Sequence, residues 1–225
     1  MSEEFFSAIK QGDKDEVERL LKLDPVLIHA KENGISPILV AAYHQKPAIA
    51  SFLADKTVAI NIFEAAATGK INNLIRLLAR DPQLVNAYAE DGFQPLGLAC
   101  FFGHLDTAEY LVKAGASINA LSHNSLKAAP IHSAAAGGHP KIVKMLFEHH
   151  ADPNIREQGG YTPLHAAAQN GDEEMIRSLL FGGADLTLTS HDGKTALDLA
   201  MEAGHERAIL LLGEGITKRF MQKRD

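Results

Sequence analysis

The sequence contains no tryptophan, a single cysteine and no long apolar run. Because Cys100 has no partner in the chain, an intramolecular disulfide is excluded, and a reducing cytoplasm is the expected location. No segment approaches the roughly 20 consecutive apolar residues of a membrane helix, so no membrane association is expected. The N-terminal sequence MSEEFFSAIK is acidic where a secretory signal peptide would be basic.

The chain is also short of positive charge. Its 22 lysines and arginines face 28 aspartates and glutamates, which gives a net charge of −6. A protein that grips phosphate backbones needs a basic stripe, so no nucleic-acid partner is expected. The basic residues near the C-terminus are interpreted as a solvated tail: Lys218, Arg219, Lys223 and Arg224.

An internal repeat dominates what the sequence does contain. Five segments align with one another: SPILVAAYHQK (36–46), QPLGLACFFGH (94–104), APIHSAAAGGH (129–139), YTPLHAAAQNGD (161–172) and KTALDLAMEAGH (194–205). Glycines recur near the ends of four of them, at Gly103, Gly138, Gly171 and Gly204. Such a regular recurrence is the signature of a repeat architecture.

The repeat extends to the N-terminus with one irregularity. Gly69 lies one period before Gly103, but the interval from Gly12 to Gly69 is too long for one period and too short for two. Gln45 takes the glycine's place within that interval, one full period after Gly12. The first and third units also match each other directly, for example in their Asp-Pro pairs at 24–25 and 81–82.

These intervals predict seven units, of which the second is cut short between Gln45 and Gly69. Their approximate bounds are 1–33, 34–58, 59–90, 91–124, 125–157, 158–190 and 191–225. We expect the seven units to form a single domain.

Each unit reads as two helices joined by a turn. Proline opens the first helix, where its missing N–H costs nothing, and glycine caps the end of that helix in a left-handed conformation. Small residues between them allow neighbouring helices to approach closely: Ala41/Ala42, Ala65/Ala66, Ala99/Cys100, Ala134/Ala135 and Ala167/Ala168. The second helix has apolar residues at helical spacing, such as Ile142, Val143, Leu146 and Phe147.

The period, the TPLH motif and this helix–turn–helix pattern resemble the ankyrin repeat family over nearly the whole chain. The phrases DPQLVNAYAEDGFQPLGLACFFGH and ASINALSHNSLKAAPIHSAAAGGH look most like bacterial stand-alone ankyrin proteins. The resemblance implies an all-α solenoid with β-hairpin fingers, in which the short second unit lacks its finger and residues 122–127 lengthen another. The terminal units lack TPLH and are expected to act as caps.

Two enzymatic or metal-binding alternatives remain open in the sequence. Cys100 and His104 are four positions apart and could form a thiolate–imidazole pair, but Cys100 stands where other units place alanine and is simplest as a small buried residue. His149 and His150, with Asp152 nearby, could hold a metal ion. The resemblance instead assigns structural roles within the repeat to other histidines: His104, His132, His139, His165 and His205. No catalytic residue, cofactor or metal is predicted.

The family resemblance implies that a partner protein binds the concave face, through finger tips and the exposed ends of the first helices. Carried over position by position, it selects a set of candidate contacts: Tyr43, His44, Phe93, Phe101, Phe102, Tyr161, Gln169, Asn170, Lys194 and Glu202. In the fifth unit the corresponding Ala136 and Gly137 leave room for a partner to approach. His123 and Leu126 on the long finger are a second candidate contact, for which an ordinary surface insertion is the alternative.

Aromatic residues are enriched at these positions, although aromatics are only 6% of the chain. An exposed patch formed by Tyr43, Phe93, Phe101, Phe102 and Tyr161 would mark an interface. The alternatives are that Phe101 or Phe102 enlarges the core, or that the patch is buried between copies of the chain. The favoured interpretation is a monomeric cytoplasmic interaction module of adaptor or inhibitor type.

Overall fold

The computed structural model describes the backbone of residues 1–222 and the side chains of residues 1–215. Within that part, 14 α-helices and two 3-10 helices follow one another, and the only β-structure is two isolated bridges, Glu32–Ile35 and Thr189–Thr195. The predicted all-α repeat solenoid is confirmed, with fingers that are tight turns and not extended hairpins. Residues 223–225 of the expected last unit, and the side chains of the expected basic tail, lie outside the described residues.

The α-helices form seven consecutive pairs, and each pair is a first and a second helix. The pairs are α1 (Ser2–Gln11) and α2 (Lys14–Leu23); α3 (Pro37–Tyr43) and α4 (Pro47–Lys56); α5 (Ile62–Ala67) and α6 (Ile71–Arg80); α7 (Pro95–Phe101) and α8 (Leu105–Lys113); α9 (Pro130–Ala136) and α10 (Pro140–Glu148); α11 (Pro163–Asn170) and α12 (Glu173–Phe181); α13 (Ala196–Glu202) and α14 (Glu206–Gln222). The 3-10 helices η1 (Pro25–His29) and η2 (Pro82–Asn86) follow α2 and α6.

The local chemistry of each pair follows the repeat. Proline occupies the first turn of α3, α7, α9 and α11, and glycine with positive φ follows the first helix in six of the seven pairs. Gln45 stands in that place after α3 and adopts the same left-handed conformation, with φ of 55°. Asp13 and Asp172 cap the second helices α2 and α12 by accepting hydrogen bonds from backbone N–H groups.

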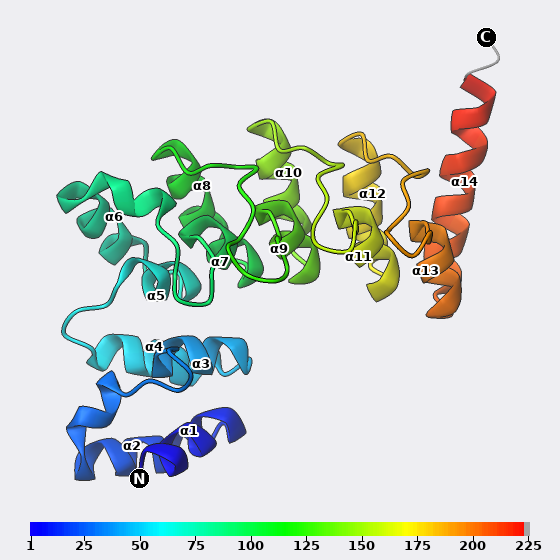
Figure 1. Cartoon of the computed structure of the whole chain (residues 1–225). Helices are drawn as coiled ribbons and strands as arrows, with labels where there is room; N and C mark the ends of the chain where they lie inside the picture. The colour runs from blue at the N-terminus through cyan, green and yellow to red at the C-terminus, as the bar shows by residue number, and fades with distance from the viewer. Residues whose placement is uncertain (223–225) are drawn as a thin grey trace.

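Small buried residues hold the first helices together. From α5 to α13 these helices stand side by side in one row, and the second helices form a parallel layer behind them (Figure 1). Ala65, Ala99, Ala134 and Ala167 are fully buried between neighbours in the row, as is Cys100. Side chains without branching at these positions allow the helices to approach closely, which is the role that the sequence predicts for them.

The second pair interrupts this row. Only residues 57–61 join α4 to α5, so the second unit lacks a finger, as predicted. The first two pairs (blue to cyan in Figure 1) are consequently set off from the straight row that α7 to α13 form. The turn before α7 meets both the turn before α3 and the end of α3: Glu90 forms an ion pair with Lys31, and Asp91 Oδ2 accepts a hydrogen bond from the Tyr43 hydroxyl at 2.6 Å. The truncation therefore creates a corner in the solenoid.

Candidate functional site

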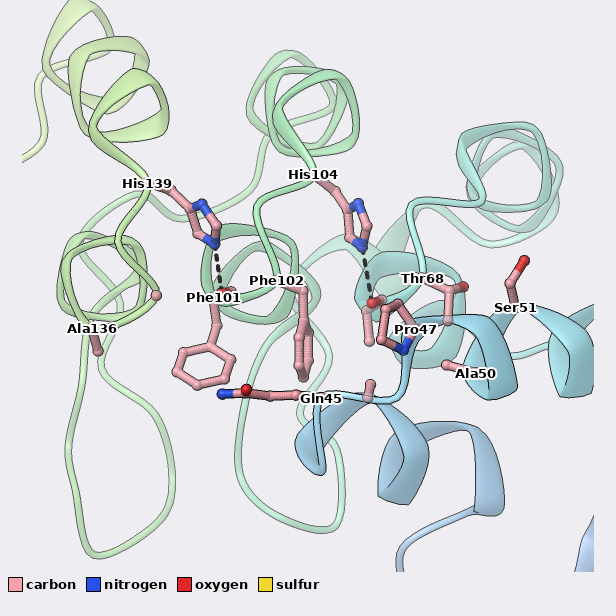
Figure 2. A pocket seen from close by; sticks show the side chains of 13 residues that line it. Gln45, Pro47, Ala50, Ser51, Thr68, Phe101, Phe102, His104, Ala136 and His139 are labelled. Carbon is pink, nitrogen blue, oxygen red and sulfur yellow. Dashed lines mark hydrogen bonds between the residues drawn. The ribbon is translucent and has the colours of Figure 1, made fainter. Parts of the chain in front are cut away.

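A pocket of about 350 Å³ lies in this corner. Figure 2 shows the α3–α4 turn facing the ends of α7 and α9 across it. Four consecutive helix pairs contribute to its lining: Gln45, Pro47 and Ser51 come from the second pair, Thr68 from the third, Phe101, Phe102 and His104 from the fourth, and Ala136, Gly137 and His139 from the fifth. The volume is at the lower end of the range for ligand pockets, which suits one or two large side chains. We refer to it as the corner pocket.

Two adjacent phenylalanines form its apolar wall. Phe101 is 38% exposed, whereas Phe102 is half-buried and packs edge-on against it, with ring centroids 5.1 Å apart. Tyr43 supports Phe102 from the other side at 5.5 Å. Burial, and secondarily the hydrogen bond to Asp91, raises the pKa of the Tyr43 hydroxyl, so this group stays neutral and fixed. Tyr43 thus supports the wall from behind Phe102 without lining the pocket, and Phe101 is the exposed part of the wall.

The opposite side of the pocket is polar and uncharged. Gln45 is exposed, and its side chain extends toward Phe101 and Phe102 (Figure 2). Lys70 Nζ lies beside Ser51 at 3.2 Å and forms an ion pair with Asp55 at 2.7 Å, so its charge is already compensated. The corner pocket therefore offers apolar contact together with neutral hydrogen-bonding groups, and no unpaired charge among the side chains that line it.

The structure brings together some of the residues that the sequence selects and separates others. Tyr43, Phe101 and Phe102 are in contact, and the exposed His44 follows Tyr43 directly. Phe93 is half-buried against the core and does not line the pocket, and neither does Tyr161. The five aromatic residues therefore do not form one patch around the pocket, because the corner gathers only the side chains at the end of α3 and α7.

The remaining candidates lie toward the C-terminal end of the row. Gln169 and Asn170 are exposed at the end of α11. Lys194 forms an ion pair with Glu202 at 2.7 Å, and the Tyr161 ring packs edge-on against His165. These residues form a polar surface on the sixth and seventh helix pairs, beyond the fifth pair, which is the last to line the corner pocket.

The long finger, residues 122–127, packs against the finger before it. The His123 ring stacks on Tyr88 with centroids 3.5 Å apart, and the Asn124 side chain donates a hydrogen bond to the Asp91 carbonyl at 2.9 Å. Leu126 stays 51% exposed at the tip. His123 and Asn124 thus have structural partners, and Leu126 is the residue of this finger whose apolar side chain is open to another molecule.

Several lining residues were not selected from the sequence. Pro47 and Ser51 belong to the second helix α4, which the transfer did not use, whereas Thr68 precedes Gly69 as Phe102 precedes Gly103 and was passed over. Ala136 and Gly137 do line the pocket, and Gly137 has a further reason to be glycine: a Cβ there would lie 2.3 Å from the Phe101 carbonyl oxygen. The one available signal was Gln45, a non-glycine residue at a left-handed position, because such strain often marks a functional site.

Five histidines form hydrogen bonds that stabilise the solenoid. Carbonyl oxygens can only accept, so the Nε2 atoms of three rings must donate to them: His104 to Ala67, His139 to Phe101 and His205 to Gln169, each at 3.0 Å. His132 and His165 accept a backbone N–H at Nδ1 and donate from Nε2 to the carbonyl of the next unit. Burial lowers the pKa of His132 to about 4 and also lowers that of His165, which keeps both rings neutral.

The thiol and metal alternatives find no support in this geometry. Cys100 is fully buried and burial raises the pKa of its thiol, whereas a nucleophilic cysteine needs a lowered pKa and access to substrate. His150 replaces a glycine at a left-handed position, and its carbonyl accepts a hydrogen bond from Asn119. In the part of the chain that the structure describes, no group of three histidine, cysteine or acidic side chains is placed to hold a metal ion. None of the helices described there is both long and apolar enough to cross a membrane.

Comparison with known proteins agrees with the fold. The sequence matches the family model of ankyrin repeats in three overlapping stretches, residues 5–122, 62–157 and 131–221. It is similar to inversin of Danio rerio, with 35% identity over 91 residues, which cover 40% of this chain and 9% of that protein. It is also similar to the ankyrin repeat and KH domain-containing protein mask of Drosophila melanogaster, with 32% identity over 142 residues, or 57% of this chain and 4% of that protein. A third relative is the E3 ubiquitin-protein ligase Ufd4 of Drosophila melanogaster, with 35% identity over 78 residues, or 35% of this chain and 3% of that protein.

The chain spans less than a tenth of the length of each of these relatives, so the similarity concerns their repeats and not their other parts. Ankyrin repeats generally mediate protein–protein interactions and are typically not catalytic. The family match covers almost the whole chain, and the helix pairs, caps and histidine contacts agree with it. The chain therefore belongs to the ankyrin repeat family.

Proposed function

We propose that this chain is a protein-interaction module that holds a segment of a partner protein against its concave face, with the corner pocket as the anchor point. The observation that carries the proposal is the exposed Phe101 at the wall of a pocket of about 350 Å³ that has an apolar wall and no unpaired charge. A large apolar side chain inserted beside Phe101 would be desolvated on several sides, as are the anchors that dominate protein interfaces.

The remaining candidate contacts extend this surface in both directions along the row. Phe93, His123 and Leu126 lie toward the fingers, and His44 lies at the end of α3 beside Gln45. The polar group Tyr161, Gln169, Asn170, Lys194 and Glu202 would contact the same partner farther along. In this proposal the seven units act as one domain, the chain is a monomer, and it works as an adaptor or inhibitor without catalysis. A cytoplasmic location and a kinship with bacterial stand-alone ankyrin proteins complete the proposal, and both rest on the sequence alone.

The test compares substitutions of two exposed phenylalanines, one in the corner pocket and one outside it. Phe101→Ser removes the pocket wall, and Phe181→Ser is the matched control because Phe181 is 93% exposed and lies at the end of α12, outside the pocket. Both variants and the wild type are used to capture proteins from lysate of the source organism, with mass spectrometry as the readout. We expect a protein that wild type and Phe181→Ser retain and Phe101→Ser loses.

Once that partner is identified, its dissociation constant should rise about 30-fold for Phe101→Ser, which corresponds to about 2 kcal/mol for a hot-spot aromatic residue. Equal binding by both variants would refute the corner pocket as the anchor. Loss of binding in both would point to a nonspecific apolar effect. Helical circular dichroism of each variant checks that the fold is intact.

A further inference from the structure

A second groove, of about 380 Å³, lies at the N-terminal end of the molecule and away from the corner pocket. Its floor and walls are mainly apolar and come from α2, η1, α4 and the short link after α4: Leu21, Pro25, Ile28, Phe52 and Val58. Val58 is fully exposed, and Leu23 and Val26 beside the groove are 63% and 72% exposed. Three large apolar side chains this exposed within one region are uncommon on a monomer surface. We refer to this feature as the N-terminal groove.

The groove exists because a contact that recurs elsewhere in the chain is missing here. Asn86, at the end of η2, donates a hydrogen bond to the Gly115 carbonyl at 3.1 Å and accepts one from the Ser117 N–H at 2.8 Å. These bonds hold the turn after α8, the second helix of the next pair, against η2. Asn119 and Asn154 bind the turns after α10 and α12 in the same way.

The first unit has His29 where the third has Asn86, since aligning the Asp-Pro pairs at the start of η1 and η2 places these two residues opposite each other. The truncated second unit has no turn after α4 that could pack over η1 as the turn after α8 packs over η2. His29 is consequently exposed, and the apolar residues of η1 and α4 line an open groove. The missing turn is what leaves this surface available to a segment of another molecule.

The rim of the groove is basic. Lys22 and Lys56 line it, and within the described part of the chain neither forms an ion pair. The ammonium groups of Lys14 and Lys56 lie 5.3 and 5.8 Å from the centre of the Phe52 ring. Glu18 is the single carboxylate among the lining residues, and it lies 3.7 Å from Lys14 Nζ. On a chain whose net charge is −6, this apolar groove is thus bordered by an excess of positive charge.

We propose that the N-terminal groove binds a short acidic segment of a second partner protein. A leucine or aromatic side chain of that segment packs against Leu21, Ile28 and Phe52, in the place that the missing turn would cover. Flanking carboxylates meet Lys22 and Lys56, which form no ion pair within the described part of the chain. The chain then presents two separate surfaces, and it acts as an adaptor that joins two proteins and not as an inhibitor of one. Peptide binding at the N-terminal groove is independent of the corner pocket, whereas the adaptor role also rests on the proposed function.

The test selects peptides without assuming a partner. A phage-displayed library of random dodecapeptides is selected on the immobilised wild-type chain, with soluble Lys22→Glu/Lys56→Glu variant present as competitor to remove phage that bind elsewhere. We expect enrichment of peptides in which aspartate or glutamate flanks leucine or phenylalanine. The synthetic peptides should bind wild type about tenfold more tightly than the charge-reversed variant, and higher salt should weaken binding.

A matched control carries the same change of charge. Lys141→Glu/Lys144→Glu reverses two exposed lysines of α10, and it should bind the selected peptides as wild type does. Phe101→Ser should bind them equally well, because the corner pocket is not involved; loss of partner capture in that variant is a separate result. Circular dichroism and urea unfolding verify that all variants are folded.

Three results would overturn the proposal. The first is that no peptide enriches above a surface without the chain. The second is that the enriched peptides lack acidic residues or bind both charge-reversed variants alike. The third is a wild-type dimer in sedimentation that Lys22→Glu/Lys56→Glu dissociates and the α10 control does not, since the groove would then be an interface between copies of this chain.

Discussion

Replacing Gln45 with glycine should make the chain more stable and its corner pocket less effective. Gln45 follows α3 at the position where six other first helices are followed by glycine, and its φ of 55° is in the left-handed region. A residue with a Cβ is strained there by about 1–2 kcal/mol. Strain of this kind persists where the side chain has a use, and the Gln45 side chain lines the pocket opposite Phe101.

The expected gain is smaller than the strain. Glycine makes the unfolded chain more flexible, which costs about 0.5–1 kcal/mol, and Gln45 is exposed, so little packing is lost. The net change is an increase of about 0.5–1 kcal/mol in the free energy of unfolding. For a domain of this size it corresponds to a rise in Tm of about 1–4 °C. Urea unfolding followed by circular dichroism measures the first quantity, and binding of the captured partner, expected to weaken, tests the pocket.

The reverse substitution at two glycines provides the control. Gly138 has φ of 72°, and a Cβ there would have its nearest neighbour at 3.9 Å, so Gly138→Gln should cost only the conformational term. Gly103 has φ of 81°, but a Cβ there would lie 2.5 Å from the His139 ring, so Gly103→Gln should cost more. If glycine is favoured at both positions, Gln45→Gly should raise stability and Gly138→Gln should lower it. A loss of stability in both variants would refute this reasoning, because the two positions would then not share one conformational preference.

Three further predictions concern residues that stabilise the solenoid. Asn119→Ala removes hydrogen bonds to the His150 carbonyl and the Asp152 N–H, and it should lower the free energy of unfolding by about 1–2 kcal/mol in urea titrations. His29→Ala, at the equivalent position without these bonds, should change that free energy by less than about 0.5 kcal/mol. Burial lowers the pKa of His132 from 6.5 to about 4, so the unfolded chain binds the proton first as the pH falls. Stability should therefore decrease by up to about 3 kcal/mol between about pH 6.5 and pH 4, and His132→Gln should flatten this slope; an unchanged slope would contradict the assignment. The buried Cys100 should resist maleimide until the chain unfolds, and Cys100→Ala should cost no more than about 1 kcal/mol, because alanine fills the same place in other pairs.

Local sequence determined most of the fold. Proline at the start of four first helices, glycine after six of them and the small residues between specify helix pairs, because capping and close approach depend on residues a few positions apart. The shortened interval between Gln45 and Gly69 likewise predicted that the second unit lacks its finger, since too few residues remain to form one. The histidines of the TPLH motif bind neighbouring backbone as their repeat positions imply.

The candidate sites depended on how the pairs are placed in space. Position-by-position transfer found Tyr43, Phe101 and Phe102, which do meet, but it also grouped Phe93 and Tyr161 with them, because it assumed a regular row. Neither pocket could be located from the repeat pattern. Deletion of one finger turns the first two pairs out of the row, which brings the α3–α4 turn against α7 on one side and uncovers η1 on the other. Repeat patterns record contacts between regular adjacent units. The corner pocket depends instead on how the α3–α4 turn packs against α7 and α9, and the N-terminal groove on a turn that is missing over η1, so both are defined only once the pairs pack together.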